Sequence, residues 1–224
     1  MVALLLLALS LLLSGLGTGR AAPVVFDVTH YGARPCHEGA GAQHRCPSCT
    51  QAFRTVAALA TKAASKSSQR AEILVPGPGT YVTGPINITT RTTLSISPNA
   101  VLKGSVDVNE YNIIEPLASY GSSRDGYHAR FQALVMVTPG STDVVLTGGG
   151  TLDGSGSHWW AARDHLTAGR PHLIEIHTST AVEVGYLTLL NSGFWTLHPV
   201  YSKDIHIHDL NISAPASSPN TVSV

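Results

Sequence analysis

The 224-residue sequence contains few charged side chains, few aromatic rings and no surplus of either sign of charge. Charged residues make up 12% of the chain, which is about half the usual share in a soluble domain. Lys and Arg together number 14, as do Asp and Glu, so no basic field exists to attract a polyanion, and nucleic-acid binding is not expected. Hydrophobic residues reach 43%, which is enough to bury a core and argues against disorder.

Long apolar runs are also scarce, since the sequence has a single one, Val2–Leu13. A helix that spans a membrane needs roughly 20 apolar residues, whereas this run has the length of a signal-peptide core. Small residues just before Ala22 fit a cleavage site. We therefore predict a signal peptide over residues 1–21 and a secreted, extracellular domain over residues 22–224, with no stable membrane insertion after cleavage. An uncleaved membrane anchor is the alternative.

Cysteine is rare as well, with only Cys36, Cys46 and Cys49 present. In an exported chain this number favours one structural disulfide with one cysteine left over, and the pairing stays open. A zinc site is the alternative, but no fourth cysteine exists and no nearby histidines have a matching spacing, so we predict no metal site and no cofactor. Asn87 and Asn211 each begin an Asn-x-Ser/Thr glycosylation sequence, which fits export.

One helix and many short strands are expected. Residues 50–66 carry the only convincing helical pattern, with apolar side chains spaced by three and four positions. After Glu72, short apolar alternations recur between Gly, Pro, Asn and Ser, which predicts strands of two to five residues. These alternations are Ile73–Val75, Ile86–Ile88, Leu94–Ile96, Val144–Leu146, Val182–Val184 and Ile205–Ile207.

An internal repeat indicates how these strands are arranged. Four apolar residues recur at an offset of 23: Val182, Val184, Leu187 and Leu189 match Ile205, Ile207, Leu210 and Ile212. Such a period is typical of a parallel β-helix, in which coils stack about 4.8 Å apart and like residues lie over like residues. We predict an all-β solenoid whose early helix caps one open end. Residues 105–132 and 154–171 break the rhythm and are candidate walls of a groove.

Several ordered motifs resemble those of the polygalacturonase (pectinase) family of glycoside hydrolases. The matching segments are Phe26–Ala33, Gly148–Gly156 followed by Trp159 and Trp160, Arg170–Ile174, Asn191–Val200 and Ser217–Thr221. The resemblance implies a right-handed parallel β-helix and inverting hydrolysis of α-1,4-galacturonan, the pectin polysaccharide of the cell wall. An inverting glycosidase needs one carboxylic acid and one carboxylate, roughly 6.5–9.5 Å apart.

The sequence departs from the family where the acids are expected. Val222 stands in place of the first catalytic Asp of the S-P-N-T-D motif, and the later acids of the family lie beyond the last residue. Valine cannot transfer a proton, so no catalytic residue is assigned and the chain is predicted to be a truncated β-helix without activity. The alternatives are a non-catalytic pectin-binding module, with Arg124, Arg163 or Arg170 facing substrate carboxylates, and a truncated product without function.

The candidate sugar contacts are Asn220, Trp159, Trp160 and His198. The two tryptophans either stack on sugar rings or pack beneath their loop, because adjacent residues of a strand face opposite ways. Asp153 is expected to bind its own turn rather than to act as an acid. His206 and His208 share one strand face, and a metal pair is the alternative to exposed histidines, with no third ligand evident.

Overall fold

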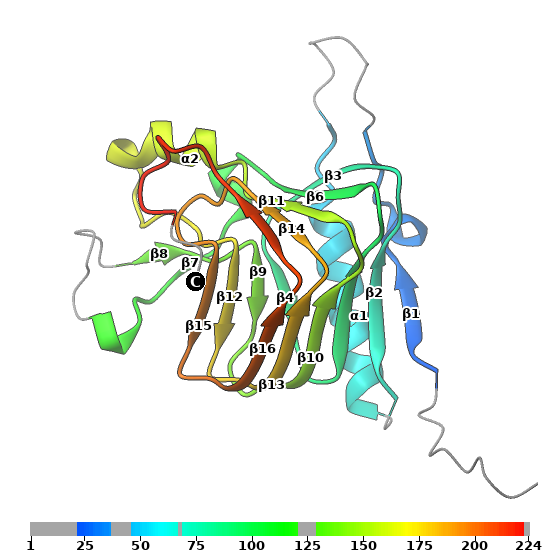
Figure 1. The fold of residues 1–224 in the computed structure, drawn as a ribbon. Coiled ribbons are helices and arrows are strands. Elements are labelled where there is room, and N and C mark those ends of the chain that lie inside the picture. Colours follow the sequence, from blue (N-terminus) through cyan, green and yellow to red (C-terminus); the bar gives the residue numbers. More distant parts are fainter. Residues whose placement is uncertain (1–21, 37–45, 67–68, 121–128, 222–224) are drawn as a thin grey trace, which may run out of the picture.

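The computed structural model describes residues 22–36, 46–66, 69–120 and 129–221. The predicted signal peptide, residues 1–21, lies outside these ranges, and so does Val222. Three parallel sheets, here named A, B and C, wrap around one apolar interior, and the chain visits them in the order A, B, C in each coil. In Figure 1 the coils follow one another from the blue end beside α1 to the red end. The predicted parallel β-helix is confirmed.

Within each sheet, strands that are neighbours in space come from successive coils. Sheet A contains β1 (Val24–Asp27), β2 (Ala71–Val75), β5 (Thr92–Ile96), β10 (Thr142–Thr147), β13 (Thr180–Gly185) and β16 (Lys203–His208). Sheet B contains β17 (Asn211–Ser213), β14 (Thr188–Leu190), β11 (Thr151–Asp153), β6 (Ala100–Gly104) and β3 (Gly79–Thr83). Sheet C contains β15 (Leu197–Val200), β12 (Ile174–His177), β9 (Val135–Val137) and β4 (Ile86–Ile88). A separate antiparallel pair joins β7 (Ile113–Ile114) to β8 (Arg130–Phe131).

Register between the coils follows the sequence repeat. Val182 pairs with Ile205 in sheet A, and Leu189 pairs with Ile212 in sheet B, so the offset of 23 is one complete coil. Because side chains alternate across a strand, each coil places apolar residues inward at matching positions. One such column crosses the whole of sheet A and consists of Phe26, Ile73, Leu94, Leu146, Val184 and Ile207.

Helix α1 (Thr50–Lys66) closes the end of the interior beside β2, as predicted (Figure 1). Its buried face consists of Thr50, Ala52, Phe53, Val56, Ala57, Ala60 and Ala64. The apolar residues of this face belong to the same core cluster as the strands. At the other end of the coil, the inward residues of β16 and β17 are only partly buried. No helix within the described ranges has the length and apolar character needed to cross a membrane.

Both irregular segments leave the coil between a strand of sheet B and a strand of sheet C. The first contains η2 (Val108–Glu110), β7, η3 (Ala118–Tyr120) and β8, and the second contains α2 (Gly156–Ala162) and η4 (Arg163–His165). They meet in a small core of Tyr111, Phe131, Trp159 and Ala168, which is separate from the interior of the coil. The insertions therefore build onto one corner without disturbing the stacked strands.

The structure decides the cysteine pairing that the sequence left open. Cys36 and Cys46 form the disulfide, and Cys49 is free and buried, with its Sγ beside the backbone N–H and carbonyl of Arg34. Burial raises the pKa of the Cys49 thiol. Cys49 is therefore a small core residue, whereas the disulfide joins the two residues that flank positions 37–45.

Replacing Leu146 by Ala tests the inward column. Leu146 is buried between Leu94 and Val184, so we expect a loss of about 2–5 kcal/mol in the free energy of unfolding. Val145, its neighbour on β10, points away from the interior and is the matched control, with Val145→Ala costing clearly less. Urea unfolding measures both variants, and equal losses would contradict the assigned register.

Candidate functional site

The outward face of sheet C carries one side chain from each coil in register. Asn87 pairs with Met136, Met136 with Glu175, and Glu175 with His198. Their strand neighbours, such as Ile174 and Ile176, point into the core. The four outward side chains therefore form a row that runs along the axis of the coil, and we call it the sheet C row.

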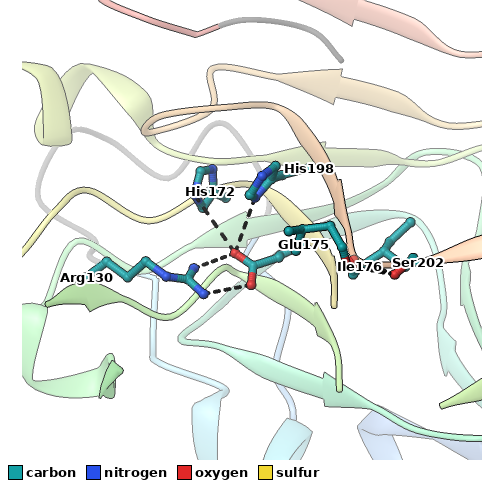
Figure 2. A network of polar contacts seen from close by, with 7 residues as sticks. Arg130, His172, Glu175, Ile176, His198 and Ser202 are labelled. Atoms are coloured by element: carbon teal, nitrogen blue, oxygen red, sulfur yellow. Dashed lines mark hydrogen bonds and ion pairs between the residues drawn. The ribbon is translucent and has the colours of Figure 1, made fainter. Parts of the chain in front are cut away.

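Glu175 is the centre of a buried polar network (Figure 2). Arg130, from β8, reaches both carboxylate oxygens, with Nη2 2.8 Å from Oε1 and Nη1 on Oε2. Two imidazoles approach Oε2 from the other side, His198 Nδ1 at 3.6 Å and His172 Nε2 at 3.9 Å. Glu175 is 0% exposed, so its charge depends on these neighbours for stabilisation.

The network holds Glu175 ionised. Burial by itself raises the pKa of Glu175, but hydrogen bonds from His198 and Arg130 outweigh it and lower that pKa to about 2. Burial lowers the pKa of His172 to about 3, although the Glu175 charge opposes this. A carboxylate paired with a guanidinium thus faces a neutral imidazole. Such a carboxylate can accept hydrogen bonds, but it is a poor proton donor.

A cavity of about 590 Å³ adjoins this network. Its wall comes from sheet C and from the segment around η3, and it includes Glu115, Arg130, Glu175, His177 and Tyr201. Burial lowers the pKa of His177. The cavity therefore contains both signs of charge, together with an exposed aromatic ring.

Asn87, one of the two predicted glycosylation sites, also lines the cavity. Its Oδ1 accepts a hydrogen bond of 2.6 Å from Gln132 Nε2, and a glycan on Asn87 would occupy the space in front of sheet C. Asn211 is exposed on β17, in sheet B. Of the two predicted glycosylation sites, only Asn87 lines the cavity, so only a glycan on Asn87 would compete with a ligand there.

For Trp159 the structure favours the second alternative, packing beneath its loop. The two tryptophans lie on α2 rather than on a strand, and Trp159 is 0% exposed. Its ring packs edge-on against Tyr111 at 5.0 Å between centroids, so it supports the inserted segments and presents no face to a sugar. Trp160 is half-buried and donates from Nε1 to the Ser192 carbonyl at 3.0 Å. Contact of Trp160 with a sugar stays a prediction.

His198 and Asn220 differ in their accessibility. His198 belongs to the sheet C row but is only 6% exposed, with its ring 4.7 Å from those of His172 and Trp195. Asn220 is exposed and has the left-handed backbone, with φ of 54°. Direct sugar contact by either residue stays a prediction, and His198 in this structure serves the Glu175 network.

The candidate arginines are placed differently from one another. Arg170 is buried, donates to the carbonyls of Gly193 and Pro219 at 2.9 Å each, and lies over the Phe194 ring. It therefore holds the loop that carries Asn220, and its contact with substrate carboxylates stays a prediction. Arg163 is exposed beside Asp164, and Arg124 lies outside the described residues.

Asp153 behaves as predicted from its turn. Its Oδ1 accepts a hydrogen bond of 2.9 Å from the Ser155 backbone N–H, and its Oδ2 lies 3.0 Å from Lys103 Nζ. The carboxylate is thus committed to local structure. The residues that the sequence reasoning missed are Glu175 and Arg130. The outward position of Glu175 could have been read from its place between Ile174 and Ile176, but no sequence signal pairs it with Arg130.

Two groups of side chains have a composition suited to a metal ion, one of them being His172, Glu175 and His198. In that group the Arg130 guanidinium already binds both carboxylate oxygens, so a divalent cation would lie close to a second positive charge. We assign it no metal. The other group lies on sheet A and consists of Glu183, His206 and His208.

The sequence of this chain is similar to the sequences of known glycoside hydrolases. The family model "Glycosyl hydrolases family 28" matches residues 66–224. A probable polygalacturonase from Vitis vinifera is 41% identical over 176 residues, which cover 77% of this chain and 35% of the relative. The chain spans about a third of the length of the curated relatives it matches.

Solved structures agree in fold. The Yersinia enterocolitica family 28 exopolygalacturonase matches with a TM-score of 0.65 and 17% identity, over 87% of this chain and 39% of that one. The polygalacturonase of Erwinia carotovora matches with a TM-score of 0.63 and 17% identity, over 89% of this chain and 51% of that one. At these identities the likeness concerns the fold alone.

Replacing Arg130 by Met tests the ion pair. The variant leaves the Glu175 charge buried without its main partner, so we expect a loss of about 3–5 kcal/mol in unfolding free energy. Adding Glu175→Gln to that variant removes the stranded charge and should recover part of the loss. Arg163→Met, at an exposed arginine, is the control. A loss below about 1 kcal/mol for Arg130→Met would contradict the network's role.

Acid should destabilise the fold through the same network. The folded pKa of His172 lies below its unfolded value of 6.5, so the unfolded chain binds the proton first and stability falls as pH drops below 6.5. Glu175 adds a second loss between 4.5 and about 2. In urea unfolding at pH 7, 6 and 5, His172→Gln should flatten the dependence by up to about 1.4 kcal/mol per pH unit. Parallel curves for both proteins would refute this.

Proposed function

The chain belongs to glycosyl hydrolases family 28. On that premise we propose that it provides the polysaccharide-binding surface of a hydrolase that cleaves α-1,4-galacturonan, the pectin polysaccharide, with inversion. The relatives it matches include a probable polygalacturonase from Vitis vinifera and an exopolygalacturonase from Zea mays, which supports this substrate class. Within that protein, the coils described above form a surface for the polysaccharide rather than the proton-transfer machinery.

The sheet C row is the observation that carries the proposal. Its members lie on successive coils, which are spaced by about 4.8 Å, so the row extends along the axis of the coil. Met136, Glu175 and His198 are buried, so a linear polysaccharide laid along this axis would contact the more exposed residues of the cavity that the row borders. The adjoining cavity offers it hydrogen-bonding groups and the Tyr201 ring, which is 49% exposed. Aromatic and polar groups together are the usual lining of a ligand site.

Glu175 and Asp153, the two carboxylates whose contacts are described above, do not suit proton donation. Inverting hydrolysis requires a carboxylic acid that protonates the leaving oxygen and a carboxylate that activates water. Glu175 stays ionised beside Arg130, and Asp153 is held by Lys103 and its own turn. We therefore assign binding without cleavage to the 224-residue chain, which makes a non-catalytic pectin-binding role the function of these coils taken alone.

Secretion is part of the same proposal. The apolar run Val2–Leu13 supports it, and so does the Cys36–Cys46 disulfide, because disulfides persist in oxidising compartments. An exported protein meets pectin in the cell wall, where a polygalacturonan-binding face is useful.

Affinity electrophoresis in a gel containing polygalacturonate tests the binding face. The chain should be retarded, and Tyr201→Ala should weaken the apparent affinity about fivefold, since one aromatic contact is worth about 1 kcal/mol. Tyr186, which is 57% exposed but lies outside the cavity lining, is the matched control, and Tyr186→Ala should be retarded like the wild type. Equal loss of affinity in both variants would show that the polysaccharide binds elsewhere. No retardation of the wild-type chain would contradict pectin binding altogether.

A reducing-sugar assay on the same preparations separates binding from cleavage. We expect no release above the level of boiled protein, because Glu175 and Asp153 are committed to other contacts and Val222 stands where the family has its first catalytic Asp. Sustained release that scales with protein concentration would overturn the assignment of binding without cleavage, while leaving the binding face itself in place.

A further inference from the structure

The outward face of sheet A carries a second cluster of side chains, separate from the cavity on sheet C. Glu183 lies on β13 and pairs in register with His206 on β16, while His208 pairs with Gly185. The intervening residues, such as Val184 and Ile207, point into the core, so Glu183, His206 and His208 share the outward face. We propose that these three side chains bind a divalent transition metal ion, for which Zn²⁺ is the best match.

Distances within the cluster suit such an ion. One ligand atom from each of the three residues can be chosen so that all lie within 4.8 Å of one another, and His208 Nε2 is 3.3 Å from Glu183 Oε1. A tetrahedral zinc ion with ligands at about 2.0–2.1 Å keeps those ligands roughly 3.4 Å apart. The His206 and His208 rings are stacked, with centroids 4.4 Å apart.

Asp209 supplies the second contact that metal-binding histidines usually have. Its Oδ2 lies 2.9 Å from His208 Nδ1, on the side of the ring away from Glu183. A carboxylate on Nδ1 places the proton there and leaves the Nε2 lone pair directed at Glu183. Two imidazoles and one carboxylate, with a further carboxylate behind one imidazole, form a common arrangement at zinc sites that keep a position open to solvent.

Gly185 makes room for the His208 ring. A Cβ at this position would lie 2.5 Å from His208 Cε1 and 2.6 Å from Nε2, so any larger residue would push the ring off the strand. His206 makes no hydrogen bond with any other residue in the described ranges, although it lies beside Glu183 and His208. A bound ion would use this imidazole. Hydrogen bonds from His208 to the carboxylates of Glu183 and Asp209 would leave the His206 imidazole unused.

Donor chemistry narrows the class of ion. Imidazole nitrogen favours zinc, nickel and copper, whereas calcium and magnesium prefer oxygen ligands and larger coordination numbers. This cluster offers two nitrogens and one carboxylate. It differs from the His172–Glu175–His198 group on sheet C, because no arginine is hydrogen-bonded or ion-paired to Glu183 within the described ranges.

Isothermal titration calorimetry of the metal-free 224-residue chain with ZnCl₂ tests the site, and the absorption of tetrahedral Co²⁺ reports its geometry. We expect one ion per chain. His206→Gln and His208→Gln should each weaken binding at least tenfold, and Asp209→Asn about tenfold to a hundredfold through the lost second contact. Asp209 has φ of 47°, which asparagine also tolerates, so this variant keeps the backbone. CaCl₂ should give no heat of binding.

Two controls keep the result unambiguous. His165→Gln alters an exposed histidine on η4 and should bind zinc like the wild type. Glu183→Gln, a near-isosteric change, should weaken binding while the circular dichroism spectrum and unfolding midpoint stay unchanged. Zinc binding that survives His206→Gln and His208→Gln, or no zinc binding at 100-fold excess of metal, overturns the site.

Discussion

Parallel stacking of one coil upon the next is the constraint on which the rest of this structure depends. Each inner strand of sheet A satisfies its backbone hydrogen bonds with the strands of the neighbouring coils, and the register places apolar side chains in columns such as Leu94, Leu146 and Val184. Because side chains alternate, the same register also aligns the outward residues. The sheet C row and the Glu183–His206 pair are therefore by-products of the packing that stabilises the core.

Insertions are tolerated where this constraint is absent. Both irregular segments leave the coil at the turn between sheets B and C, where no ladder has to continue. They pack on each other through Tyr111, Phe131 and Trp159, and so form a small core outside the coil. Their main effect on sheet C is to deliver Arg130, which neutralises the buried Glu175 from a position 45 residues earlier in the chain. The wall of the cavity and the charge of its floor thus have a common origin.

Polar groups on the two outward faces differ in how their charge is balanced. On sheet C a guanidinium binds the carboxylate fully, which yields a rigid buried pair whose removal is costly. On sheet A the carboxylates of Glu183 and Asp209 face imidazoles at the surface. The first arrangement suits a fixed floor beneath a polysaccharide, and the second suits exchange of a cation with solvent. One scaffold therefore presents two kinds of polar surface.

The sequence by itself determined helix α1 and many of the stacked strands, because alternation, helical spacing and the offset of 23 are properties of local stretches of chain. It predicted α1, the short strands, the cap and the family resemblance, and the same offset places Glu183 beside His206, although that pair went unnoticed. Tertiary structure alone decided the Cys36–Cys46 pairing, the burial of Trp159 and the contact between Arg130 and Glu175. Trp159 and Arg130 lie in the inserted segments, and their contacts depend on where those segments fold back onto the coil. The two insertions differ in length, so they contain no sequence period that would predict which residues meet.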